Sequence, residues 1–132
     1  MRNLVTALFF FVSFVLFAQE HRYYCEVKGI EKSLSSGLKI IFDFGTSASY
    51  NVWGDLKKDL KFVDEKGKEI DFHSMVDAAN YMAERGWHFQ QAYSSVYGSS
   101  CVIHWIFFKD AETQEQAKEG IMTKEDYKKM KK

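Results

Sequence analysis

The chain has 132 residues, of which 46% are hydrophobic, 17% are aromatic and none is proline. This length and composition describe one small globular domain. The 18 Lys and Arg residues equal the 18 Asp and Glu residues, so no net field attracts a phosphate backbone or an anionic lipid surface. The charge balance therefore argues against generic binding to nucleic acid or to membrane surfaces.

Residues 1–18 form a segment of their own. Arg2 carries the one side-chain charge, an apolar run extends from Leu4 to Phe17, and the small residue Ala18 precedes the first polar stretch. This pattern is typical of a signal peptide. The competing interpretation is a membrane anchor, but the run is shorter than the roughly 20 residues of a membrane span. We expect cleavage after Ala18, a periplasmic or extracellular location, and no stable membrane anchor afterwards.

The two cysteines, Cys25 and Cys101, both lie in the exported part of the chain. An even pair in an oxidising compartment favours a disulfide. We expect a bridge between Cys25 and Cys101, which requires Cα atoms within about 7 Å of each other. The alternative is two separate buried thiols that act as small apolar side chains.

Hydrophobic periodicity predicts several strands and one main helix. Alternating or β-branched apolar patterns predict strands at 23–28, 38–44, 87–97 and 101–109, and a hairpin over 60–72. The strand at 101–109 is apolar on both faces, which is typical of a central strand. A helix over 75–85 is predicted by an apolar stripe, with Ser74 as its N-cap and Gly86 as its stop.

After Asp110 the composition shifts to Ala, Glu, Gln and Lys, which favour helix but supply few apolar side chains. We therefore expect a loosely docked, charged helical tail over 110–132. Together, these strand and helix patterns predict an α+β domain over 19–109, with an antiparallel sheet of about five strands packed on one main helix.

The helix ends in Gly86-Trp87 and runs directly into a hairpin that contains the segment Ile103-His104-Trp105-Ile106-Phe107. In this respect the chain resembles small exported bacterial proteins of unknown function. The resemblance covers about a third of the chain and implies a compact α+β unit in an exported protein. It implies no catalytic residue.

The histidines, His21, His73, His88 and His104, show no spacing typical of a zinc site, because no two lie within four residues of each other. If the last turn is centred on Ser99, His104 faces Ser94 and His88 faces Asp110, so these histidines do not meet. The serines cluster in turns, without a nucleophile-elbow motif or a phosphate-binding loop. We therefore expect no metal, no cofactor and no catalytic residue.

Tyrosine and tryptophan are abundant in the exported part, and these side chains suit surfaces that are apolar on one side and wet on the other. They either fill the core of a small domain or form a binding surface, for which we select Tyr93, Tyr97 and Trp105. The sequence thus predicts a non-enzymatic binding or assembly module of the bacterial envelope, with a protein, peptide or carbohydrate partner or a second copy. The alternative is a small hydrolase or metal-dependent enzyme that uses His73, His88 and a nearby Asp.

Overall fold

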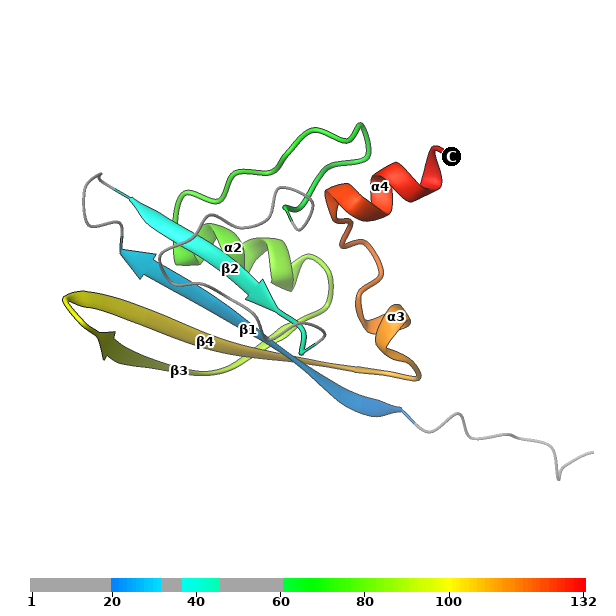
Figure 1. Ribbon diagram of the computed structural model, residues 1–132. Helices are drawn as coiled ribbons and strands as arrows, with labels where there is room; N and C mark the ends of the chain where they lie inside the picture. Colours follow the sequence, from blue (N-terminus) through cyan, green and yellow to red (C-terminus); the bar gives the residue numbers. More distant parts are fainter. Residues whose placement is uncertain (1–19, 32–36, 46–60) are drawn as a thin grey trace, which may run out of the picture.

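The structure is a computed structural model that describes residues 20–31, 37–45 and 61–132 (Figure 1). The predicted signal peptide lies outside the described residues. In chain order the elements are β1 (His21–Glu31), β2 (Leu38–Asp43), α2 (Met75–Ala83), β3 (His88–Tyr97), β4 (Ser100–Ala111), α3 (Gln114–Ala117) and α4 (Lys124–Met130).

The strands form one antiparallel sheet in the order β2-β1-β4-β3. This confirms the predicted α+β class and the interior position of β4. The expectation of about five strands is wrong, because the described part of the sheet has four. The predicted hairpin over 60–72 forms, but it stays outside the sheet. Val63 and Glu69 make an antiparallel bridge, and the N–H groups of Ile70 and Asp64 donate to the carbonyl oxygens of Phe62 and Lys68. Phe62 also bridges to Thr123 of the tail.

Helix α2 forms where the apolar stripe predicts it. The Ser74 side chain accepts a hydrogen bond from the backbone N–H of Asp77 and so caps the helix N-terminus. Gly86 has a φ of 78°, a left-handed conformation that side chains with a Cβ rarely adopt, and it reverses the chain after the last turn. The apolar stripe is buried and consists of Met75, Ala78, Tyr81 and Met82.

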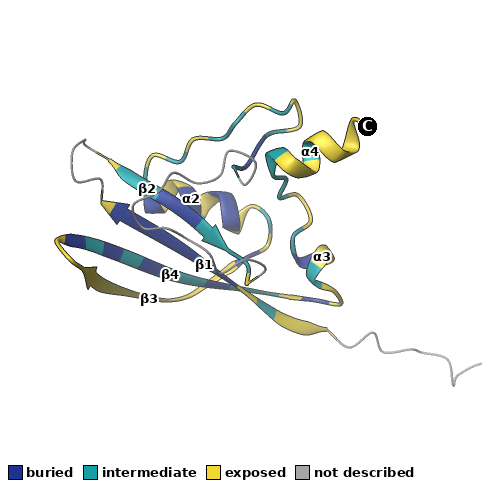
Figure 2. Cartoon of the chain, viewed as in Figure 1, coloured by how far each residue is buried: buried dark blue, intermediate teal, exposed yellow. Residues whose placement is uncertain are grey.

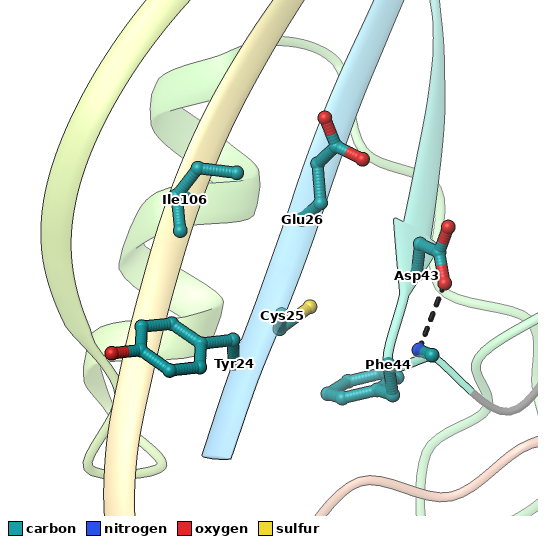
Figure 3. A pocket seen from close by; sticks show the side chains of 7 residues that line it. Tyr24, Cys25, Glu26, Asp43, Phe44 and Ile106 are labelled. Carbon is teal, nitrogen blue, oxygen red and sulfur yellow. Dashed lines mark hydrogen bonds between the residues drawn. The ribbon is translucent and has the colours of Figure 1, made fainter. Parts of the chain in front are cut away.

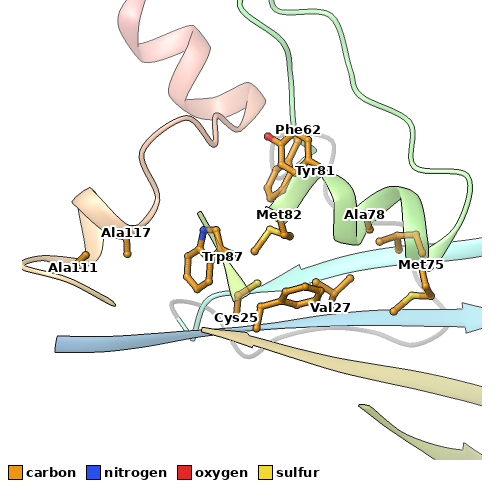
Figure 4. Close-up of a cluster of buried hydrophobic side chains, with 12 residues drawn as sticks. Cys25, Val27, Phe62, Met75, Ala78, Tyr81, Met82, Trp87, Ala111 and Ala117 are labelled. Atoms are coloured by element: carbon orange, nitrogen blue, oxygen red, sulfur yellow. The ribbon is translucent and has the colours of Figure 1, made fainter. Parts of the chain in front are cut away.

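The helices lie on one side of the sheet (Figure 4). On this side, which we call the helix face, Cys25 and Val27 of β1 and Phe107 of β4 pack against the buried stripe of α2 and Trp87. Phe107, Val27 and Met82 are among the largest fully buried side chains. We call the other side the second face. It carries the alternate residues of each strand, because successive side chains of a strand point to opposite faces.

The tail is docked more closely than its composition suggests. The backbone N–H groups of Val63 and Lys124 donate to the carbonyl oxygens of Met122 and Lys61, each over 2.9 Å. The carboxylate of Glu69 also accepts from Lys124 at 2.6 Å and from Lys61 at 2.9 Å. The tail therefore depends on backbone pairing and ion pairs with residues 61–70 rather than on a large apolar area of its own.

Candidate functional site

A cluster of charged and polar side chains is centred on Glu26 of the second face. One carboxylate oxygen of Glu26, Oε1, lies 2.7 Å from Nδ1 of His104 and 2.9 Å from the hydroxyl of Tyr93. The other, Oε2, lies 2.9 Å from Nζ of Lys28. Nζ of Lys28 also lies 3.1 Å from Oδ2 of Asp43. One ammonium group thus joins two carboxylates, and one of these carboxylates holds an imidazole.

Strand register brings these groups together. Glu26 is directly opposite Asp43 of β2, while Lys28, two residues along β1, is directly opposite His104 of β4. Residues two apart on one strand share a face, and long side chains reach diagonal neighbours on the adjacent strand. The diagonal contacts here are Glu26 with His104 and Lys28 with Asp43. The cluster therefore needs β2, β1 and β4 in their observed order.

The cluster contains two buried polar side chains. Lys28 is 4% exposed and His104 is 8% exposed. Burial by itself would raise the pKa of Glu26, but hydrogen bonds from Lys28, His104 and Tyr93 hold the pKa of this carboxyl below its ordinary value. Burial opposes the charge of Lys28 as well, yet its bonds to Glu26 and Asp43 raise its pKa. Glu26 is therefore a carboxylate and Lys28 an ammonium at neutral pH.

Two further contacts fix the imidazole of His104. The ring of Tyr93 stacks on it, with centroids 4.4 Å apart and planes 4° from parallel. Nε2 of His104 lies 2.8 Å from Oγ of Ser95. Tyr93 is directly opposite His104, and Ser95 follows two residues later on the same face of β3. The Ser95 hydroxyl, the His104 imidazole and the Glu26 carboxylate are consequently connected by two successive hydrogen bonds.

A shallow hollow of about 400 Å³ lies beside Glu26 (Figure 3). It is lined by Tyr24, Cys25, Glu26, Asp43, Phe44, Gly45 and Ile106. Asp43 accepts a hydrogen bond from the backbone N–H of Gly45 at 2.9 Å. Burial raises the pKa of the Cys25 thiol far above its ordinary range, so Cys25 offers no thiolate here. The hollow presents carboxylate oxygens and apolar carbon to a ligand.

The aromatic residues selected from the sequence lie on two different faces. Tyr93 and Tyr97 project from the second face of β3 and are 48% and 58% exposed. Trp105 is opposite Ala92 on the helix face, half-buried, with its ring centroid 5.6 Å from that of Phe89. The structure thus brings the two tyrosines to one surface and separates Trp105 from them.

The register of the last hairpin differs from the predicted one. Tyr97 is opposite Ser100, so a two-residue turn replaces the turn centred on Ser99, and His104 faces Tyr93 rather than Ser94. A shift of one residue exchanges the two faces of a strand, which is why Ser95 rather than Ser94 reaches His104. An irregularity between Phe89 and Gln91 shifts the pairing again. The Gly98-Ser99 pair is typical of a two-residue turn. A register built on that turn would have placed Ser95, rather than Ser94, on the same face as His104.

The expected disulfide between Cys25 and Cys101 is wrong. Both cysteines are free thiols. The register places Phe107 opposite Cys25, and Cys101 lies six residues away along β4, or about 20 Å at 3.4 Å per residue. A bridge needs Cα atoms within about 7 Å, so antiparallel pairing in this register excludes it.

The histidines of the alternative enzyme hypothesis lie apart in the fold. His73 precedes α2, with Nδ1 3.6 Å from Asp77, and is largely exposed. His88 follows α2 and lies opposite Phe108 at the start of β3. The nine residues of α2 that separate them span about 13 Å. Within the described residues, no three His, Cys, Asp or Glu side chains are grouped so that they could hold a metal ion.

Comparison with protein families, curated proteins and solved structures gives no match for this chain. The resemblance carried by Gly86-Trp87 therefore stays a prediction. In the part of the chain that the structure describes, no helix has both the length and the apolar character needed to cross a membrane.

Proposed function

We propose that this chain is an exported assembly module whose partner is a second copy of itself, joined through strand β3. The signal-peptide pattern of residues 1–18 supports export to the periplasm or the cell exterior. The observation that carries the proposal is the exposure of β3. All ten of its residues are exposed, although it belongs to a sheet with a well-formed core (Figure 2).

Strand β3 is at one edge of the described sheet, where one side of its backbone has no strand beside it. Such edges pair readily with another chain, and natural proteins protect them with charges, proline or short length. Between His88 and Tyr97 there is no Asp, Glu, Lys, Arg or Pro. The opposite edge, β2, is six residues long and carries Lys39 and Asp43. The edge of β3 therefore lacks the protection that the β2 edge has.

The side chains of β3 also favour association. Phe89 and Val96 are 53% and 78% exposed, and Tyr97 is 58% exposed. Burying such groups against a partner releases water from apolar surface and favours association. A partner strand would add main-chain hydrogen bonds at the edge, as in β-strand addition.

A second copy suits this edge better than a charged ligand does. An isologous interface needs a surface that tolerates contact with itself, and a strand without formal charge brings no like-charge repulsion. The net charge of zero becomes −1 when Arg2 is lost with residues 1–18, and so small a charge also permits close approach of two copies. Antiparallel pairing of two β3 strands would join two four-stranded sheets into one continuous sheet.

The test is the solution mass of the exported protein, measured by light scattering after chromatography. We expect twice the chain mass for the wild type and the mass of one chain for Val96→Lys, since a lysine on an edge strand is one of the devices by which natural proteins block pairing with another chain. Val76→Lys is the matched control, because Val76 is 59% exposed on α2, away from the edge, and this variant should remain a dimer. A monomeric wild type, with or without a bound peptide or carbohydrate, would contradict self-association, as would equal effects of the two lysine variants.

A further inference from the structure

The line of hydrogen bonds through Ser95, His104 and Glu26 has the arrangement of a nucleophile, a base and an orienting carboxylate. Oγ of Ser95 lies 2.8 Å from Nε2 of His104, and Nδ1 of the same ring lies 2.7 Å from Oε1 of Glu26. These distances fall within the hydrogen-bonding range that an activated hydroxyl requires. The three groups come from β3, β4 and β1, so the arrangement rests on strands rather than on a loop.

The charge state of Glu26 determines which way each hydrogen bond points. Lys28, His104 and Tyr93 keep this side chain ionised, and a carboxylate only accepts hydrogen bonds. Nδ1 of His104 must therefore donate to it. In a neutral imidazole this leaves Nε2 as the acceptor, directed at the Ser95 hydroxyl. The hydroxyl is thus the donor to Nε2, which is the polarity that proton removal from a nucleophile needs.

The surroundings hold the base and leave the nucleophile accessible. The His104 ring is stacked against Tyr93 and is 8% exposed, so its orientation is fixed before any ligand arrives. Ser95, by contrast, belongs to a strand that is exposed at every residue. A ligand can therefore reach the hydroxyl from solvent without displacing the imidazole.

We propose that Ser95 is the nucleophile of an acyl-transfer site, with His104 as the general base and Glu26 as the carboxylate that orients the imidazole. The substrate class is a carboxylic ester with a small acyl group. An exposed strand can present Ser95 to such an ester, whereas a bulky acyl chain would need an enclosing pocket around the hydroxyl.

In the acylation step, Oγ of Ser95 forms a bond to the ester carbonyl carbon while its proton passes to Nε2 of His104. The bond from that carbon to the alcohol oxygen then breaks, and the alcohol leaves with the proton from Nε2. Water next attacks the acyl-serine, gives its proton to His104, and releases the carboxylic acid as Oγ regains a proton. Glu26 remains ionised throughout and stabilises the transient imidazolium. The balance is ester plus water to acid plus alcohol.

This inference is independent of strand pairing. The side chain of Ser95 points out of the sheet, whereas association would use the backbone edge of β3 in the plane of the sheet. The monomeric variant Val96→Lys should therefore retain a reactive serine. Loss of the dimer and loss of the activity would be separate results.

The first experiment is labelling of the exported protein with a fluorophosphonate, read by intact mass and peptide mapping. We expect one phosphonyl group per chain, on Ser95, and none in Ser95→Ala. Ser94→Ala is the matched control, because Ser94 is opposite Ile103 on the helix face and should label like the wild type. An unlabelled wild type, or a label on another residue, would overturn the proposal.

The second experiment is the rate of p-nitrophenyl acetate hydrolysis. Ser95→Ala should lower the rate above background by about 100-fold or more, in the range that general-base activation contributes, while Ser94→Ala should leave it unchanged. Ser95→Ala should also remain folded, as judged by circular dichroism, because Ser95 is exposed. Equal rates in the two alanine variants would overturn the proposal even if both are fully folded.

Discussion

The carboxylate of Glu26 and the imidazole of His104 lie 2.7 Å apart, although 78 residues separate them in the chain. They meet because β1 pairs with β4, the last strand of the sheet in sequence order, and because both side chains point to the second face. Glu26 simultaneously holds Lys28 and Tyr93. One residue thus connects the ion pairs of β1 and β2 to the aromatic and hydroxyl groups of β3.

We expect Glu26→Gln to destabilise the protein strongly. The variant leaves the ammonium of Lys28, which is 4% exposed, without one of its two carboxylate partners, and breaking a buried ion pair costs about 3 kcal/mol of unfolding free energy. Urea unfolding followed by circular dichroism measures this change. Asp110→Asn is the control, since it removes the exposed ion pair with Arg22 and such pairs contribute little. Similar losses of unfolding free energy in Glu26→Gln and Asp110→Asn would contradict the conclusion that burial makes the Glu26–Lys28 ion pair important for stability.

Acid should destabilise the wild type partly through Glu26. The folded state lowers the pKa of Glu26 below its ordinary value of 4.5, so near and below that pH the unfolded state binds the proton more readily. The stabilisation is fully present above about pH 4.5 and is lost as pH falls through the folded pKa. Urea midpoints measured from neutral pH downward should decline, and Glu26→Gln should decline less steeply. Some decline should remain in the variant, because the pKa of Glu69 is also low, at about 2.

Cys25 and Cys101 should react with an alkylating agent to different extents. The experiment needs no reductant, because both residues are free thiols. Cys101 is partly exposed, whereas Cys25 is 1% exposed and burial raises the pKa of its thiol. We expect alkylation of the native protein to modify Cys101 alone, and alkylation in denaturant to modify both residues. Intact mass counts the added groups. If the denatured chain took up no alkylating agent, Cys25 and Cys101 would be shown to form the disulfide that the register excludes.

Docking of the tail should depend on Gly67. Its φ is 79°, and a Cβ at this position would collide with the ring of Tyr127 in α4. Gly98→Ala is the matched control, because Gly98 has a φ of 62° and a Cβ added there would have no neighbour within 4 Å. Backbone strain alone should cost Gly98→Ala about 1 kcal/mol, and Gly67→Ala should cost more. Tryptic cleavage within the tail should accelerate only in Gly67→Ala, and equal rates would contradict the contact with Tyr127.

Helix α2 and its boundaries could be predicted from the sequence, because their causes are local. The Ser74 cap, the apolar stripe and the left-handed Gly86 each act within one or two helical turns. The interior position of β4 could be predicted as well, since apolar residues on both faces suit a strand with neighbours on each side. The described sheet lacks the expected fifth strand for a non-local reason, because residues near Phe62 pair with the tail near Thr123 rather than with the sheet.

Patterns among near neighbours in the chain were enough to establish the fold class and the main helix, because periodicity and caps act over short distances. Which side chains meet depended instead on the packing of distant segments. The order of the strands brought Glu26 to His104, and the length of one turn selected Ser95 instead of Ser94. The same register separated Cys25 from Cys101. A strand repeats every two residues, so a register change of one residue replaces every group on a face, and local pattern does not determine that choice.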